Sequence, residues 1–108
     1  MLLTNKTAVI TGCNKGIGKS ILEEFSKNGA NIFACVRRLD DEFNSLIEII
    51  KKENKNEIIP IEIDLSDQNQ VKEAGKKILS HDKSIDILIN NAGLISTSLF
   101  QMTPIEKY

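Results

Sequence analysis

Short apolar runs rich in β-branched residues alternate with amphipathic stretches along this chain, and this alternation constrains the fold more than any other feature. An apolar run without alternating polar residues is typical of a strand buried on both faces of a parallel sheet. The stretches in between repeat their apolar residues at helical spacing. The pattern therefore predicts βαβ units on a parallel sheet. Four strands are predicted, at Thr7–Thr11, Asn31–Val36, Ile58–Ile63 and Ile85–Ile89.

Capping signals mark the starts of the predicted helices. Asp40 or Asp41 is expected to cap the second helix, and Ser66 the third. Residues 103–106, Thr-Pro-Ile-Glu, form a capping box with proline at the first helical position, which predicts the start of a fourth helix. The inward positions of the first three helices are Ile17, Ile21, Leu22 and Phe25; Leu39, Phe43, Leu46, Ile47 and Ile50; and Val71, Ala74, Ile78 and Leu79.

The composition is that of an ordinary globular domain. With 108 residues, 41% hydrophobic and 27% charged, the chain is expected to form one domain or part of one, spanning 1–108. A net charge of -1 argues against a nucleic-acid partner. A signal peptide and an apolar run of about 20 residues are both lacking, so we expect a cytoplasmic protein without a membrane span. Cys13 and Cys35 are expected to be reduced, and no metal-ligand cluster is present.

A glycine-rich turn, residues 11–18, lies between the first predicted strand and helix. Such a turn lets backbone N–H groups and a helix N-terminus approach a phosphate, although a tight strand-to-helix turn also favours glycine for steric reasons alone. The end of the turn, Gly18-Lys19-Ser20, is similar to a nucleoside triphosphatase P-loop. That motif requires glycine five positions before Gly18, where this chain has Cys13, and the P-loop hypothesis is rejected on this spacing.

Three motifs occur in order: Thr-Gly-x-x-x-Gly-Ile-Gly at residues 11–18, Asp64-Leu65 after the third strand, and Asn-Asn-Ala-Gly at residues 90–93 after the fourth. Together they resemble the classical short-chain dehydrogenase/reductase family, and among its members the 3-oxoacyl-[acyl-carrier-protein] reductase-like group. The resemblance covers the whole chain. It implies the N-terminal half of a Rossmann-type, doubly wound α/β sheet, truncated after about four strands with flanking helices.

The resemblance also implies a nicotinamide dinucleotide as cofactor and assigns its contacts. Asp64 would accept a hydrogen bond from the adenine amino group, and Leu65 would contact the ring through its backbone. Asn90 would tie adjacent strands together. The pyrophosphate and adenosine ribose would contact Gly12, Asn14, Lys15, Gly16, Ile17 and Gly18, and the ribose on the nicotinamide side would contact Asn91, Ala92 and Gly93.

Basic residues after the second strand favour NADP(H) over NAD(H). An acidic side chain at this position accepts a hydrogen bond from the ribose 2′-hydroxyl of NAD, whereas NADP carries a phosphate there. Here the strand is followed by Arg37 and Arg38, whose guanidinium groups match a phosphate, and Lys15 can add a third positive charge. Asp40 and Asp41 lie further along and are interpreted as helix-capping residues. Alternatively, the two arginines are a solvated pair without a ligand.

The chemistry of the family depends on a serine and a Tyr-x-x-x-Lys motif, which this sequence lacks. Tyr108 is the only tyrosine and nothing follows it, so no catalytic residue is assigned. The resemblance implies an oxidoreductase that transfers a hydride between nicotinamide and a small carbonyl or alcohol substrate, with a homo-oligomeric parent protein. The 108-residue chain alone is expected to be inactive. The alternative is a non-catalytic dinucleotide-binding sensor or interaction module.

Overall fold

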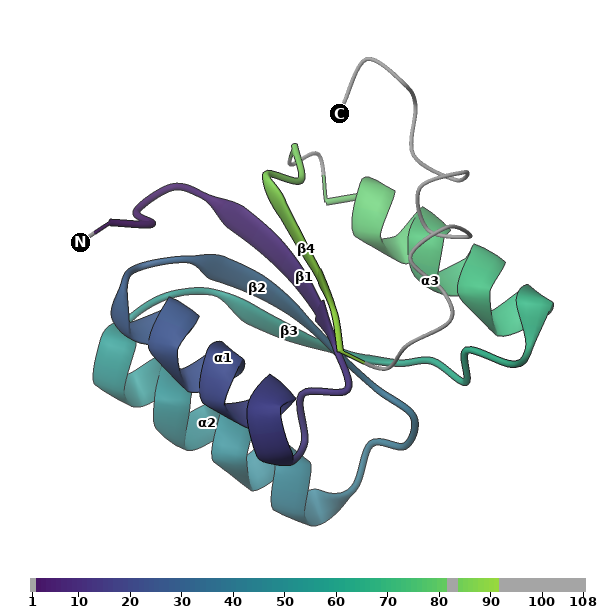
Figure 1. Ribbon diagram of the computed structural model, residues 1–108, viewed down its shortest axis with the longest axis horizontal. Helices are drawn as coiled ribbons and strands as arrows, with labels where there is room; N and C mark the ends of the chain where they lie inside the picture. The colour runs from purple at the N-terminus through teal and green to yellow at the C-terminus, as the bar shows by residue number, and fades with distance from the viewer. Residues whose placement is uncertain (1, 82–83, 92–108) are drawn as a thin grey trace.

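The computed structural model describes residues 2–81 and 84–91 as a parallel sheet of four strands with helices on both faces (Figure 1). The strands lie in the order β3-β2-β1-β4, and each neighbouring pair is parallel. In chain order the elements are β1 (Thr7–Thr11), α1 (Gly16–Lys27), β2 (Asn31–Val36), α2 (Asp41–Asn54), β3 (Ile58–Glu62), α3 (Gln68–Leu79) and β4 (Ile87–Asn90). The doubly wound α/β fold is therefore confirmed. The helix predicted at residues 103–106 lies outside the described residues.

The sheet separates two hydrophobic cores, and alternate residues of each strand belong to one core or the other. In β1, Ile10 points to the face covered by α1 and α2, where it shares a buried cluster with Leu22 and Ile47 (Figure 1). Val9 belongs to a second cluster with Ile78 of α3, on the opposite face. We call these the α1/α2 core and the α3 core. Because both faces of β1 are covered, all five of its residues are buried, as its apolar sequence predicts.

The outer strands differ from the central ones in their sequence. β3 lies at one edge of the sheet and pairs only with β2 among the described strands. An edge strand tolerates proline, which has no N–H to donate, and Pro60 lies in this strand opposite Ala34. β4 lies at the other end of the described sheet beside β1, and its residues are only half-buried. No helix in the described ranges is both long and apolar enough to cross a membrane.

The start of the fourth strand was predicted two residues too early. β4 begins at Ile87, because the preceding Asp86 contacts β1 through its side chain. The Asp86 carboxylate accepts a hydrogen bond from the Thr7 amide at 2.9 Å, and the Asp86 amide donates to the Thr7 carbonyl at 2.9 Å. A side-chain acceptor thus stands in for the strand backbone at this end of the ladder.

The N-cap residues of α2 and α3 can be compared with the predicted ones. Asp40, and not Asp41, caps α2 by accepting a hydrogen bond from the Phe43 amide at 2.8 Å. The cap of α3 is Asp67, which accepts from the amides of the third and second residues after it, and the prediction of Ser66 was wrong. The reason is that the Ser66 hydroxyl donates to Asp64 instead, at 2.7 Å.

Candidate functional site

The turn between β1 and α1 depends on glycine at two positions. Gly12 and Gly16 have φ angles of 63° and 60°, in the left-handed region that glycine adopts without steric cost. The N-cap residue of α1 is Lys15, whose backbone is extended and whose side chain makes no capping hydrogen bond. The first amide groups of α1 are therefore left for other acceptors, as in a helix N-terminus that binds an anion.

Gly18 brings the start of α1 against the end of β1. A Cβ atom at this position would overlap the carbonyl oxygen of Gly12 and lie 2.7 Å from the Asn91 side-chain nitrogen. That nitrogen donates a hydrogen bond to the same Gly12 carbonyl at 3.1 Å. Asn91 and two residues of the glycine turn, Gly12 and Gly18, therefore meet at one point, and the approach is possible only because Gly18 has no side chain.

A second set of polar contacts joins β1 to β4 at their carboxyl ends. The Thr11 hydroxyl lies 3.2 Å from the Asn90 side-chain oxygen and 3.5 Å from the Ile89 carbonyl. Asn90 thus ties the two strands together, as predicted. The sheet order changes direction here, because β2 and β3 extend from one side of β1 and β4 lies on the other. In open α/β sheets, ligands bind in the crevice at the carboxyl ends of the strands at such a point.

A cavity of about 330 Å³ lies next to this point, at the carboxyl ends of β1, β2 and β3. Its floor combines glycine-turn residues with the last apolar residues of the strands, and its rim carries the polar residues that follow β2 and β3. The lining residues are Thr11, Gly12, Asn14, Cys35, Val36, Arg37, Ile63, Asp64, Leu65 and Ser66. A pocket of this size with a few polar groups on an apolar base suits part of a small ligand.

Opposite charges face each other across the rim of this cavity. One guanidinium nitrogen of Arg37 lies 3.9 Å from the Asp64 carboxylate. The Ser66 hydroxyl and backbone amide both donate to Asp64, at 2.7 and 3.0 Å. These two hydrogen bonds, and then the charge of Arg37, lower the pKa of the Asp64 carboxyl. The carboxylate therefore stays ionised at neutral pH.

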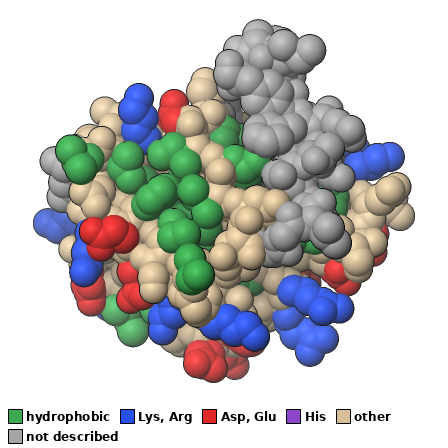
Figure 2. All heavy atoms as spheres, in the orientation of Figure 1, with side chains coloured by type: hydrophobic (Ala, Val, Ile, Leu, Met, Phe, Trp, Pro, Cys, Tyr) green, Lys and Arg blue, Asp and Glu red, His purple; other side chains and the backbone are tan. Residues whose placement is uncertain are grey.

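Other basic side chains lie in solvent near the same edge. Lys15 and Arg38 are exposed, and the cavity lining includes neither of them. Figure 2 shows Lys and Arg side chains gathered at the lower right of the molecule, over the loop that follows β2 in Figure 1. Hydrophobic side chains are instead visible over the strands and α1. The edge that carries the glycine turn and the cavity is thus also a basic edge.

A family model described as short chain dehydrogenase matches residues 6–108, almost the whole chain. The chain belongs to the short-chain dehydrogenase family. The match includes the glycine turn, Asp64-Leu65 and the residues after β4, so the resemblance inferred from the three motifs is confirmed.

Individual short-chain dehydrogenases are similar over most of this chain. A short-chain dehydrogenase/reductase of Armillaria gallica is 40% identical, and the alignment covers 86% of this chain and 29% of that protein. The 3-oxoacyl-[acyl-carrier-protein] reductase FabG of Staphylococcus epidermidis is 33% identical over 88% of this chain and 38% of its own length. The crystal structure of L-sorbose reductase from Gluconobacter frateurii, complexed with NADPH and L-sorbose, superposes with a TM-score of 0.77 and 31% identity. That match covers 99% of this chain and 40% of the reductase, so the chain spans about a third of the length of the relatives it matches.

Most of the site residues predicted for this short-chain dehydrogenase come together in the structure. Gly12, Asn14, Arg37, Asp64 and Leu65 line the 330 Å³ cavity, and Gly18 and Asn91 meet at Gly12. Lys15, Gly16, Ile17 and Arg38 are exposed and do not line the cavity. Ala92 and Gly93 lie outside the described residues.

Ile17 was predicted on the inward face of α1, and this prediction was wrong. Ile17 is 72% exposed, whereas Gly18, Leu22 and Ser26 are the buried residues of α1. Helical spacing alone therefore overestimates how much of the first turn is covered. An exposed isoleucine beside a glycine turn is available to contact a ligand.

Ser66 is the site residue that the sequence analysis assigned incorrectly. It lines the cavity and holds the Asp64 carboxylate, whereas it was predicted as a helix cap. The sequence did contain a signal for this role. A serine two residues after an aspartate can donate hydrogen bonds to the aspartate carboxylate within one turn.

Cys13 lies within the glycine turn as a free, buried cysteine. Its side chain is buried, and its thiol lies 3.5 Å from the Cys35 carbonyl oxygen. Burial raises the pKa of the Cys13 thiol from 9.0 to about 12. The thiolate that a redox-sensing role requires is therefore disfavoured at neutral pH.

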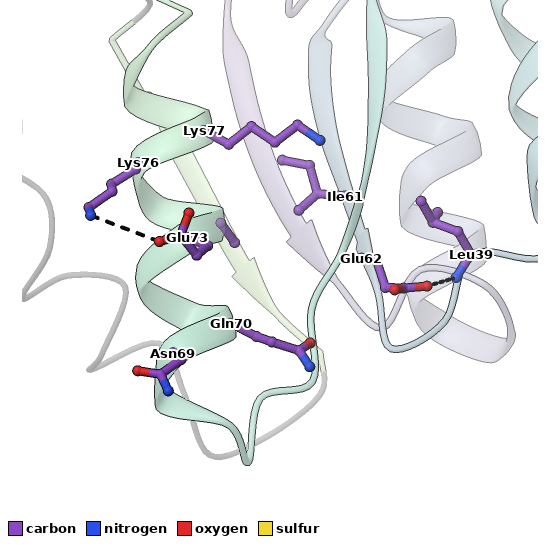
Figure 3. Close-up of a pocket in the computed structure, with 9 residues that line it drawn as sticks. Leu39, Ile61, Glu62, Asn69, Gln70, Glu73, Lys76 and Lys77 are labelled. Atoms are coloured by element: carbon purple, nitrogen blue, oxygen red, sulfur yellow. Dashed lines mark hydrogen bonds and ion pairs between the residues drawn. The ribbon is translucent and has the colours of Figure 1, made fainter.

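A larger cavity of about 670 Å³ lies away from the glycine turn, between α3 and the edge strand β3 (Figure 3). Several polar groups that line this cavity form ion pairs or hydrogen bonds with one another. The Lys76 ammonium lies 3.9 Å from the Glu73 carboxylate, and the Leu39 amide donates to Glu62 at 2.8 Å, as drawn in Figure 3. Within residues 2–81 and 84–91, no group of three or more His, Cys, Asp or Glu side chains could hold a metal ion. The smaller cavity, with its glycine turn, remains the candidate site.

Proposed function

We propose that the whole protein is an NADP(H)-dependent oxidoreductase and that this chain supplies its cofactor-binding half. The observation that carries the proposal is the close approach of Gly18 and Asn91 to the Gly12 carbonyl, beside a cavity whose rim holds Arg37. The absence of a Cβ at Gly18 lets the start of α1 pack directly on the Gly12 backbone, which is the role of the third glycine in a dinucleotide-binding turn. The family of the chain supports a nicotinamide dinucleotide as that group.

Each part of the cofactor would be bound by a different set of groups. The pyrophosphate would be bound by backbone N–H groups of the turn from Gly12 to Gly18 and by the N-terminus of α1. The adenine would contact Asp64 and Leu65. The nicotinamide side would contact Asn91, Ala92 and Gly93. When bound, the cofactor supplies a hydride to a carbonyl substrate or accepts one from an alcohol.

The charges near the adenosine end support the phosphorylated form of the cofactor. Arg37 is at the rim of the cavity, and Lys15 and Arg38 are exposed near it. The Asp40 carboxylate caps α2 through one of its oxygens, which supports its interpretation as a helix-capping residue. The NADPH in the L-sorbose reductase structure agrees with this preference in a relative. The catalytic residues belong to the whole protein, for which we propose a small carbonyl or alcohol substrate, a cytoplasmic location and a homo-oligomeric assembly.

Calorimetric titration of the chain with adenosine 2′,5′-bisphosphate and adenosine 5′-monophosphate tests this proposal. The bisphosphate is expected to bind about tenfold more tightly, because a phosphate gains charge-assisted hydrogen bonds from Arg37. Arg37→Ala should remove most of that difference, whereas Lys52→Ala, an exposed residue near the C-terminus of α2, should leave it unchanged. Equal affinities in the wild type would point to NAD(H), and failure to bind either nucleotide would overturn the proposed cofactor site.

A further inference from the structure

We propose that Asp64 limits the preference for the phosphorylated cofactor, by holding the Arg37 guanidinium that a 2′-phosphate must recruit. The proposal rests on the function proposed above and adds a specificity-determining role for Asp64 that is separate from its contact with adenine. Both side chains line the same cavity, and their charged groups lie 3.9 Å apart. A phosphate that binds Arg37 therefore approaches a carboxylate as well.

The two oxygens of the Asp64 carboxylate have different partners. Oδ1 accepts both hydrogen bonds from Ser66, at 3.0 and 2.7 Å. Oδ2 is the atom that faces Arg37. The backbone is also fixed, because the Asp64 amide donates to the Gln70 side chain at 2.8 Å and its carbonyl accepts from the Asp67 amide at 2.9 Å. Asp64 is thus a fixed negative charge at the cavity rim.

Arg37 is the adjustable partner of this pair. Its side chain is 84% exposed, compared with 31% for Asp64, and it is the first residue beyond β2. Exposed ion pairs contribute little to stability, so the guanidinium can leave Asp64 at small cost. When it moves to a phosphate, however, the Asp64 charge loses its counter-ion and repels the incoming dianion. Both effects weaken binding of a phosphorylated ribose and leave an unphosphorylated one unaffected.

Asp64→Asn separates this effect from adenine binding. Asparagine keeps an oxygen for Ser66 and replaces the charged oxygen that faces Arg37 with an uncharged amide nitrogen. Contacts to adenine are common to both probes, so they cancel in the ratio of the dissociation constants of adenosine 5′-monophosphate and adenosine 2′,5′-bisphosphate. We expect this ratio to rise about threefold in the variant at low ionic strength, and the gain to shrink as salt screens the charges.

Asp67→Asn is the matched control, since it removes the same charge three residues away and asparagine caps a helix as well as aspartate does. Its ratio should stay at the wild-type value. If Asp64→Asn leaves the ratio unchanged or lowers it, the proposal is overturned, and a lower ratio would mean that Asp64 presents Arg37 to the phosphate. If the wild type binds neither probe, the proposed function fails; if it binds both and only the ratio fails to move, the proposed function stands without this inference.

A measurement on the wild type provides a second test that needs no variant. In NMR titrations, the Arg37 side-chain N–H resonance and the Asp64 carboxyl carbon should shift together when the bisphosphate is added, because the ion pair separates. The monophosphate should shift the Arg37 resonance much less. Equal shifts with both nucleotides, or an Asp64 resonance that does not respond to the bisphosphate, would contradict the proposed exchange of partners.

Discussion

At Gly18, a single added methyl group would clash with the backbone of the candidate site. The Cβ of Gly18→Ala would meet the Gly12 carbonyl, which is backbone and cannot rotate away. We expect a loss of about 1–3 kcal/mol in the free energy of unfolding, as for other overpacked positions, and at least tenfold weaker binding of adenosine nucleotides. Urea unfolding and calorimetric titration measure the two effects. Ser20→Ala, at an exposed position of the same helix, should change neither; wild-type affinity in Gly18→Ala would contradict this account.

The two cysteines should make stability depend on pH in the alkaline range. Burial raises the pKa of both Cys13 and Cys35 from 9.0 to about 12. Above pH 9 the unfolded chain loses thiol protons that the folded chain keeps, so the free energy of unfolding should fall by about 1.4 kcal/mol per pH unit for each thiol until the pH nears 12. Below pH 9 this contribution is constant. Denaturant unfolding as a function of pH should show a shallower alkaline decline in the variant with alanine at both positions, and identical slopes would refute the assignment.

Individual site residues were predictable where the geometry of a local turn requires a particular residue type. Gly12 has a left-handed backbone conformation and Gly18 has no room for a Cβ atom, and both requirements of the strand-to-helix turn are visible in the sequence as glycine. The Arg37–Asp64 pair was not predictable, although both residues were chosen, because their contact depends on which strands are neighbours. Ser66 was misassigned because Ser66 and Asp67 are both residue types that cap a helix, and a sequence pattern does not rank the two.

At the scale of whole elements, the two adjacent aspartates before α2 offer a direct comparison. Asp40 accepts the Phe43 amide, whereas Asp41 is the first residue of the helix. Asp40→Ala should reduce the free energy of unfolding by about 1 kcal/mol, the usual effect of losing an N-cap. Asp41→Ala should cost only a few tenths of a kcal/mol through the helix dipole. Urea unfolding of both variants distinguishes them, and similar losses would mean that the cap is shared.

The bounds of an element were predicted well where a clear change of residue type marks its end. β1 and β2 have the predicted bounds, because their apolar runs end at glycine or at charged residues. β4 was predicted too early, because Ile85 continues the apolar pattern while Asp86 replaces the ladder with a side-chain contact. Side-chain substitutes for backbone hydrogen bonds cannot be recognised from hydrophobicity.

At the scale of the whole molecule, the sheet divides the interior into two cores that should contribute independently to stability. Ile47 belongs to the α1/α2 core and Ile78 to the α3 core, and no buried residue is shared between the two clusters as far as the described residues show. Ile47→Val and Ile78→Val should each cost about 0.5–1.5 kcal/mol. In the double variant the losses should add to within about 0.5 kcal/mol, because the sites share no partners. Denaturant unfolding tests this, and a larger coupling would show that the sheet transmits packing changes between its faces.

The arrangement of the whole molecule was the least accessible to pattern reasoning alone. Periodicity predicts strands and helices but does not order them. The family resemblance predicted a doubly wound sheet, and the structure gives its strand order as β3-β2-β1-β4. The family match confirms that resemblance over residues 6–108. Cofactor preference depends on a few surface charges that vary independently of the fold, so it stays a proposal.

The central position of β1 also determines the order in which the described sheet can assemble during synthesis. β1 is made before β4, and the residues of β4 that pair with it lie 79 positions later, as Ile87 does from Ala8. At about 5–20 residues per second, a ribosome needs several seconds to supply that partner. During this interval β1, β2 and β3 can already associate, but one side of β1 stays open, and such an open edge attracts other chains. The glycine turn can form early, whereas the contact of Asn91 with Gly12 can form only after nearly the whole described chain has been translated. Nucleotide binding at this site would thus have to wait until Asn91 has been translated.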